Sequence, residues 1–216
     1  AYFMKEVWGM NPLCVCFETT MVTEIGRRNL DNISKMGIDV IHFKKNYNAY
    51  KSMVKEGFIR VGDEMWPNHI GIFTIPINIA VKFNIPLIIW GENSQQEYGG
   101  PLESIENNKL TRSWLEEFGG LLGLRITDLS EIYKFKDSDL YFYIYPSEEE
   151  LNQFEVTSLF LGYYESWDNL RNAEVSKKNG FSTFSGPIEN GYFDFEKLDN
   201  YQHGIHDYFK YLKYGF

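Results

Sequence analysis

Short apolar segments that alternate with helical patterns are the feature that most limits what this chain can fold into. The segment LCVCF, at Leu13–Phe17, lies between polar residues and is too short for a helix, so it predicts a buried strand. Two further strands are expected at Ile38–Phe43 and Ile85–Trp90. Helices are expected between them, at residues 25–36, 47–61 and 70–83. This order is typical of an α/β fold with a parallel sheet covered on both faces.

The ends of two of these helices carry cap signals. Thr23 is expected to cap the helix over residues 25–36, and Gly37 is expected to end it. Asn68 or His69 is expected to cap the mostly apolar helix that starts at residue 70.

The second half of the chain has a different character, because aromatic residues gather in two segments there. These segments, SDLYFYIY at 138–145 and VTSLFLGYY at 156–164, predict strands. Helices are expected at residues 102–118, 167–178 and 197–213. The chain is therefore divided into an α/β domain over residues 1–118 and an aromatic-rich α+β extension over residues 119–216.

Charge and composition exclude several classes of protein. The formal net charge of −9 argues against a dedicated nucleic-acid binder, which needs clustered lysines and arginines. No apolar stretch is long enough to span a bilayer and no signal peptide is visible, so a cytoplasmic protein is expected. The two cysteines, Cys14 and Cys16, are interpreted as small buried side chains in a reducing compartment, because a zinc site would need two further ligands.

Polar residues follow each predicted strand. Glu18, Thr19 and Thr20 follow the first, and Gly91 and the residues after it follow the third. In open parallel sheets, ligands bind beyond the carboxyl ends of the strands. The pattern predicts a small-molecule crevice at this edge.

The segment WGENSQQEYGG, which begins at Trp90, is the most informative of these strand ends. Gly91 would let a ligand approach the backbone closely, and Glu92 and Glu97 lie among side-chain amides. Such oxygen ligands suit Mg²⁺ held against phosphate oxygens. The alternative is an ordinary turn with solvated glutamates.

A second candidate segment is GDEMWPNHIG, at residues 62–71. Asp63, Glu64 and His69 flank Trp66 just before the apolar helix, whose N-terminus would favour an anionic group. The alternative is a capping loop whose tryptophan packs in the core. His203 and His206 share one helical turn, but no third metal ligand is placed near them, so they are interpreted as surface or half-buried histidines.

The same segments resemble the N-acetyl sugar amidotransferases. These belong to the PP-loop ATP pyrophosphatase group, whose fold is the Rossmann-like HUP fold of the adenine nucleotide α-hydrolases. The resemblance covers nearly the whole chain, and WGEN…EYGG is its most specific part. The other segments that carry it are PLCVCFETTMVTEIGRRNLDNI, GDEMWPNHIGIFTIPINIAVKFNIPLII, FLGYYESWD and HDYFKYLKYGF.

The resemblance implies an adenylation reaction. ATP activates the oxygen of a sugar's N-acetyl group and pyrophosphate leaves; ammonia from a glutaminase partner then displaces AMP and produces an acetamidino group. Such sugars enter bacterial O-antigen or flagellar glycans, among them nonulosonic acids and di-N-acetylated hexuronates. ATP and Mg²⁺ are the implied cofactors.

The resemblance also implies roles for particular positions. Three groups of residues are carried over: an adenosine side at Phe17, Glu18 and Thr19; an ATP crevice at Gly91, Glu92 and Asn93, with Glu97 as a contact to Mg²⁺ or pyrophosphate; and a sugar side at Asp63, Trp66 and His69. Glu92 and Glu97 are the two residues expected to act in catalysis.

The chain also departs from the family pattern. The family's phosphate loop, SGG-x-DS, should precede Ala1 and is absent, as are the N-terminal cysteine pairs and the continuation beyond Phe216. This pattern predicts a piece of a longer protein that shows no turnover by itself, because the loop cradles the phosphates. A missing first strand would expose a sheet edge and favour a homo-oligomer.

Two other functions compete with this one. The first is a non-catalytic HUP-like module that binds a nucleotide or a partner. The second keeps the ATP pyrophosphatase chemistry but acts on another substrate such as a tRNA, although the acidic charge counts against it.

Overall fold

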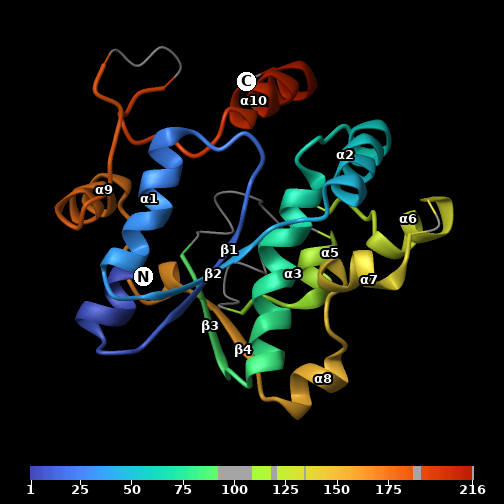
Figure 1. Ribbon diagram of the computed structural model, residues 1–216, viewed down its shortest axis with the longest axis horizontal. Coiled ribbons are helices and arrows are strands. Elements are labelled where there is room, and N and C mark those ends of the chain that lie inside the picture. The colour runs from blue at the N-terminus through green and yellow to red at the C-terminus, as the bar shows by residue number, and fades with distance from the viewer. Residues whose placement is uncertain (92–108, 118–120, 134, 187–190, 216) are drawn as a thin grey trace. The chain divides into compact units, whose positions relative to one another are not determined.

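The chain divides into two compact units, and each is considered by itself. Unit 1 contains Ala1–Lys44 and Asp168–Phe216, and unit 2 contains Lys45–Trp167. The computed structural model describes residues 1–91, 109–117, 121–133, 135–186 and 191–215 (Figure 1). The domain boundary predicted at residue 118 lies outside the described residues.

Unit 1 is built around two parallel strands. These are β1 (Leu13–Phe17) and β2 (Asp39–Phe43), whose register pairs Leu13 with Asp39 and Phe17 with Phe43. Helix α1 (Glu24–Lys35) connects them and contacts β2 (Figure 1). The other described helices of the unit are the π-helical turn η1 (Phe3–Val7), α9 (Asn169–Lys178) and α10 (Gln202–Tyr214).

The start of α1 confirms the predicted cap. The Thr23 side chain accepts a hydrogen bond from the Gly26 backbone N–H at 2.9 Å, and its hydroxyl donates to the Leu198 carbonyl. Gly26 has no room for a side chain, because a Cβ there would lie 2.4 Å from the Asp199 carbonyl oxygen. The C-terminal segment of unit 1 therefore packs directly on the first turn of α1.

Side-chain amides of α1 bind the other part of unit 1. Asn29 donates to the Ser182 carbonyl at 3.0 Å and accepts from the Ser182 N–H at 2.7 Å. Asn32 donates to the Asn179 carbonyl at 2.6 Å. The side chains of these two asparagines thus hydrogen-bond to backbone groups more than 140 residues away in the sequence, and they join the two stretches of chain that make up unit 1.

Unit 2 has its own parallel pair and a layer of helices. Strands β3 (Leu87–Trp90) and β4 (Thr157–Phe160) pair with Leu87 opposite Thr157. Helices α2 (Tyr47–Val61) and α3 (Trp66–Phe83) lie side by side, and α3 contacts β3 (Figure 1). Shorter elements complete the described part: α5 (Arg112–Glu117), α6 (Ile126–Tyr133), α7 (Asp137–Leu140), η3 (Tyr141–Tyr143), α8 (Glu148–Gln153) and η4 (Leu161–Tyr163).

Helix α3 supplies the core of unit 2. It is apolar on most of its circumference, which is typical of a buried helix. Its fully buried side chains include Trp66, Ile70, Phe73, Ile75 and Ile77. The Phe73 ring lies 5.3 Å from the ring of Trp90 at the end of β3, so helix and strand share one core.

The expected mixed α/β fold with parallel strands is confirmed, in the form of two small two-stranded sheets. The strand expected at Ser138–Tyr145 is wrong, because this segment forms α7 and the 3₁₀ turn η3. The buried Asn78 amide of α3 donates to the Ile144 carbonyl at 3.0 Å and satisfies a backbone group that would otherwise need a strand partner.

Two further predictions differ from the structure at their ends. Strand β4 stops at Phe160, where the chain turns into η4 instead of continuing to Tyr164. Of the helix expected at residues 102–118, Arg112–Glu117 forms α5, whereas residues 109–111 are not helical and Lys109 forms a bridge with Leu159; residues 102–108 and 118 lie outside the described part. Among the described helices, none combines the length and the apolar character needed to cross a membrane.

Candidate functional site

The loop between α2 and α3 holds the clearest cluster of polar side chains in unit 2. Helix α2 ends at Gly62, whose positive φ of 67° suits glycine, and the chain then turns back toward α2. Gly57 allows the loop to approach α2 closely, because a Cβ at this position would lie 2.7 Å from the Asp63 carbonyl oxygen and 2.6 Å from the Trp66 Cβ. The glycine in α2 therefore fixes where Asp63 lies.

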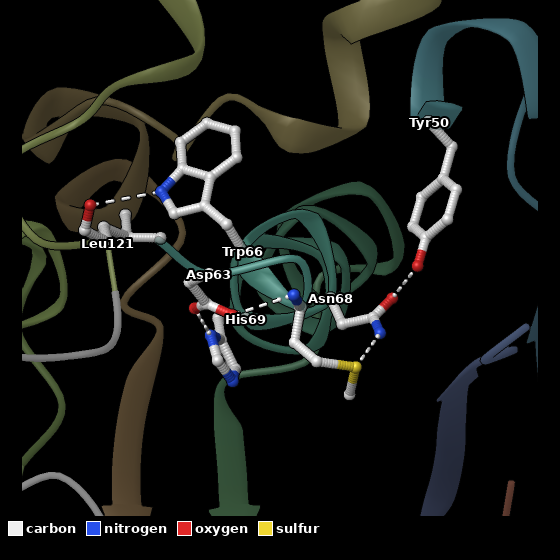
Figure 2. Close-up of polar contacts among 7 residues, drawn as sticks. Tyr50, Asp63, Trp66, Asn68, His69 and Leu121 are labelled. Carbon is white, nitrogen blue, oxygen red and sulfur yellow. Dashed lines mark hydrogen bonds and ion pairs between the residues drawn. The ribbon is translucent and has the colours of Figure 1, made fainter. Parts of the chain in front are cut away.

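Asp63 and His69 form a pair across the start of α3. The Asp63 Oδ2 lies 3.0 Å from the His69 Nδ1, and the Asp63 Oδ1 accepts from the Met65 backbone N–H at 2.8 Å (Figure 2). The Asp63 backbone N–H donates to the Gly57 carbonyl at 3.2 Å. Asp63 is thus held by backbone hydrogen bonds on two sides, and its carboxylate lies within ion-pair distance of the imidazole.

Exposure differs between the two members of the pair. The His69 side chain keeps 18% of its accessible surface, whereas that of Asp63 keeps 8%. A molecule reaching this site would therefore meet the imidazole before the carboxylate. A histidine whose Nδ1 faces a carboxylate has its Nε2 as the basic nitrogen, which is the arrangement of a general base.

A second buried carboxylate adjoins this pair. Glu64 is only 7% exposed and directly follows Asp63 in the sequence. Buried carboxylates are costly to keep charged, and they concentrate at functional sites.

The predicted ligand contact Trp66 is placed in the core. Its side chain is fully buried, and its indole N–H donates to the Leu121 carbonyl at 3.1 Å (Figure 2). This is the alternative that the sequence left open, a loop whose tryptophan packs on the core. Trp66 therefore anchors the loop, and its ring has no exposed face for a ligand to stack on.

The predicted helix cap at Asn68 or His69 is wrong. Helix α3 begins at Trp66 with Pro67 in its first turn, where proline fits because it has no N–H to leave unbonded. Asn68 is buried inside the helix instead, where its Oδ1 accepts from the Tyr50 hydroxyl at 2.9 Å (Figure 2).

Unit 1 has its own polar cluster at the end of β1. The Glu18 Oε1 lies 3.2 Å from an Arg27 guanidinium nitrogen and 3.7 Å from the His42 Nδ1. Cys16 is the register partner of His42 on the neighbouring strand. Burial and the negative charges of Glu18 and Asp199 raise the pKa of the Cys16 thiol to about 11, so this sulfur stays protonated and is a poor nucleophile.

The two neighbours of Glu18 have different surroundings. Phe17 is buried and stacks on Phe43 with ring centroids 6.1 Å apart, so it belongs to the core of unit 1. Thr19 is half-buried, and the Thr20 hydroxyl donates to the Gln202 side-chain oxygen at 2.6 Å. Glu18 is thus the charged member of this strand end.

In the segment that follows β3, Gly91 is described but the next residues are not. Gly91 follows β3 and is exposed, and no atom of the described residues would lie within 4 Å of a Cβ added there. The predicted residues Glu92, Asn93 and Glu97 lie outside the described residues.

The predicted site residues are therefore shared between the units. Phe17, Glu18 and Thr19 belong to unit 1, whereas Gly91, Asp63, Trp66 and His69 belong to unit 2. Sequence reasoning did not single out Arg27 and His42 as partners of Glu18. His42 has no spacing signal, because only the β1–β2 register brings it to Glu18, whereas Arg27 lies nine residues along the chain at the start of the following helix.

Comparison of the chain with known protein families and with curated proteins gives no match.

Proposed function

We propose that this chain takes part in ATP-dependent amidotransfer to an N-acetylated sugar, within a Rossmann-like HUP fold. The observation that carries the proposal is the Asp63–His69 pair, with its Oδ2–Nδ1 distance of 3.0 Å. It lies in the segment Gly62–Gly71, one of the segments that resemble this family. A partly exposed imidazole within ion-pair distance of a buried carboxylate supports proton transfer at this point.

The reaction needs a base at its second step. In the first step the N-acetyl oxygen bonds to the α-phosphorus of ATP, and the bond to the leaving pyrophosphate breaks. Ammonia then adds to the acyl carbon, AMP leaves with the oxygen, and the nitrogen loses a proton. His69 Nε2 would take that proton, and the charge of Asp63 would stabilise the imidazolium that results.

The nucleotide side of the proposal is carried by other residues. In unit 2, Gly91 would let a nucleotide approach the backbone. In unit 1, the strand end at Phe17, Glu18 and Thr19 is the segment proposed for the adenosine side. Since Phe17 is buried against Phe43, backbone groups and Glu18 are the better candidates for contact. Mg²⁺, when bound, would offset phosphate charge, and the ligand predicted for it is Glu97.

The partners and setting of the reaction follow from the same proposal. A glutaminase subunit would supply the ammonia, and the product would enter bacterial O-antigen or flagellar glycans.

The test measures pyrophosphate release by the full-length gene product. ATP, ammonia and a panel of di-N-acetylated sugars are supplied, and His69→Ala and Asp63→Asn are compared with the unchanged protein. Loss of a general base lowers the rate by about 10²–10⁴-fold, so His69→Ala is expected to fall in this range. His203→Ala, which removes a half-buried histidine of α10, is the matched control and should keep the rate.

The competing functions give different results in the same assay. ATP binding without pyrophosphate release under any condition would favour a non-catalytic module. Release that depends on tRNA and ignores the sugars would favour an ATP pyrophosphatase with another substrate. A His69→Ala rate equal to that of the His203→Ala control would overturn the role given to the pair.

A further inference from the structure

Helix α10 carries an exposed row of large apolar side chains, called here the α10 stripe. Its members are Tyr201, Ile205, Tyr208 and Leu212, and between 46% and 66% of each residue is exposed. Their spacing of four, three and four residues puts them on one face of the helix. Tyr211, also 59% exposed, flanks this face.

The orientation of α10 is the reverse of what an amphipathic surface helix adopts. Such a helix normally faces its apolar stripe toward the core and its polar side toward water. In α10 the buried residue is Gln202, which accepts from the Thr20 hydroxyl at 2.6 Å. The polar residue faces the unit and the apolar stripe faces away, which is typical of a surface that binds another protein.

Gly204 is a second and independent observation on the same helix. A Cβ at this position would meet nothing within 4 Å, and the residue lacks the positive φ that would require glycine. Glycine inside a helix is unfavourable relative to alanine, and the packing of unit 1 gives no compensation for it. A glycine beside an exposed stripe does, however, let the backbone of a second helix approach closely.

We propose that the α10 stripe pairs with the same stripe of a second copy of this chain, with the two helices antiparallel about a twofold axis. Such an interface is self-complementary. In this register Ile205 of one copy lies opposite Tyr208 of the other, and Tyr201 lies opposite Leu212. This inference does not depend on the proposed function.

Charge does not oppose self-association through this face. The chain has a net charge of −9, so two copies repel each other overall. Helix α10 lacks this excess of negative charge, because it carries Lys210 and Lys213 against the single carboxylate Asp207. That carboxylate is itself paired with Lys197.

The area is also sufficient. A fully buried aromatic side chain removes about 150–250 Å² from water, so the stripe with Tyr211 offers on the order of 600 Å² per copy. Two copies together would exceed the about 1,000 Å² that a specific interface needs.

The test measures the mass of the 216-residue chain by sedimentation over a range of concentrations. The expected result is a species of twice 25.4 kDa that dissociates on dilution. Ile205→Lys and Tyr208→Lys should each raise the dissociation constant by about tenfold or more, as expected for residues central to an interface. Tyr214→Lys is the matched control, since Tyr214 is exposed to a similar extent but lies outside the stripe spacing.

The variant Gly204→Ala distinguishes an effect on dimer formation from an effect on folding. Alanine favours the helix, so circular dichroism should show equal or greater helix content while the dimer weakens by about tenfold. A chain that stays at 25.4 kDa up to about 100 µM would overturn the proposal. A dimer that Ile205→Lys leaves intact, or that Tyr214→Lys weakens equally, would overturn it too.

Discussion

Replacing Gly57 with alanine tests the packing that positions Asp63. A Cβ at residue 57 would lie 2.6 Å from the Trp66 Cβ and 2.7 Å from the Asp63 carbonyl oxygen. Neither atom is the end of a flexible side chain, so the loop itself must move. The gain in helix propensity is about 1 kcal/mol, and overpacking of this kind costs about 1–3 kcal/mol. A net loss of up to about 2 kcal/mol in the free energy of unfolding is expected.

Urea unfolding followed by tryptophan fluorescence measures this loss. Four of the five tryptophans, Trp66, Trp90, Trp114 and Trp167, lie in unit 2 together with Gly57, so the signal reports mainly on that unit. The midpoint should fall while the slope of the transition stays unchanged, because the area exposed on unfolding is the same.

A glycine in open space supplies the control for this variant. Gly204 also lies inside a helix, but an added Cβ would meet nothing within 4 Å. Gly204→Ala, measured at a concentration low enough to keep the chain monomeric, should therefore be neutral or stabilising by up to about 1 kcal/mol. A Gly57→Ala protein that gains as much stability as Gly204→Ala does would refute the argument that contact at residue 57 fixes the loop.

Three further substitutions test other parts of the structure. Trp66→Phe leaves the Leu121 carbonyl without its indole donor and should cost about 1–3 kcal/mol, measured by the same unfolding assay. Thr23→Ala removes the cap that accepts from Gly26 and should cost about 1–2 kcal/mol, read from the loss of helix signal during unfolding. Folding raises the pKa of the Cys16 thiol from 9.0 to about 11. The protonated thiol therefore contributes fully to the free energy of unfolding below pH 9, and this contribution is lost as the pH rises toward 11. The stability difference between the original protein and Cys16→Ser should therefore shrink over that interval, and a difference independent of pH would contradict the shift.

The elements that local signals specify were predicted closely. The helix at Tyr47–Val61 and the strand at Leu13–Phe17 have the expected bounds, and Thr23 caps α1 as expected. In the two helices the periodicity, the cap residue and the terminating glycine agree with one another, so tertiary packing has nothing to override.

The aromatic segment at residues 138–145 shows where local signals fail. Its tyrosines and phenylalanine favour a strand, but strand propensity mostly measures fit to a neighbouring strand. Here the side-chain amide of Asn78, on helix α3, donates a hydrogen bond to the Ile144 carbonyl, and Tyr143 is buried. The segment therefore forms a turn instead of a strand, and this contact with α3 is not visible in the local sequence.

The candidate site likewise combines contacts that the local sequence predicts with contacts that depend on residues far apart in the sequence. Asp63 and His69 are six residues apart at a helix start, so their proximity follows from the local sequence and could be anticipated. His42 reaches Glu18 only through the register of β1 and β2. The burial of Trp66 depends on Leu121, which is distant in the sequence, so its role in the core could be named only as an alternative.

The asparagine contacts of α1 have a consequence for how the chain is made. Residues 1–44 leave the ribosome before unit 2, but Asn29 and Asn32 bind backbone groups at residues 179–182, which are synthesised after unit 2. Unit 2 is continuous in sequence, and closing a short loop costs less entropy than closing a long one. Unit 2 is therefore expected to fold during synthesis, while β1 and α1 wait for the C-terminal segment to complete unit 1.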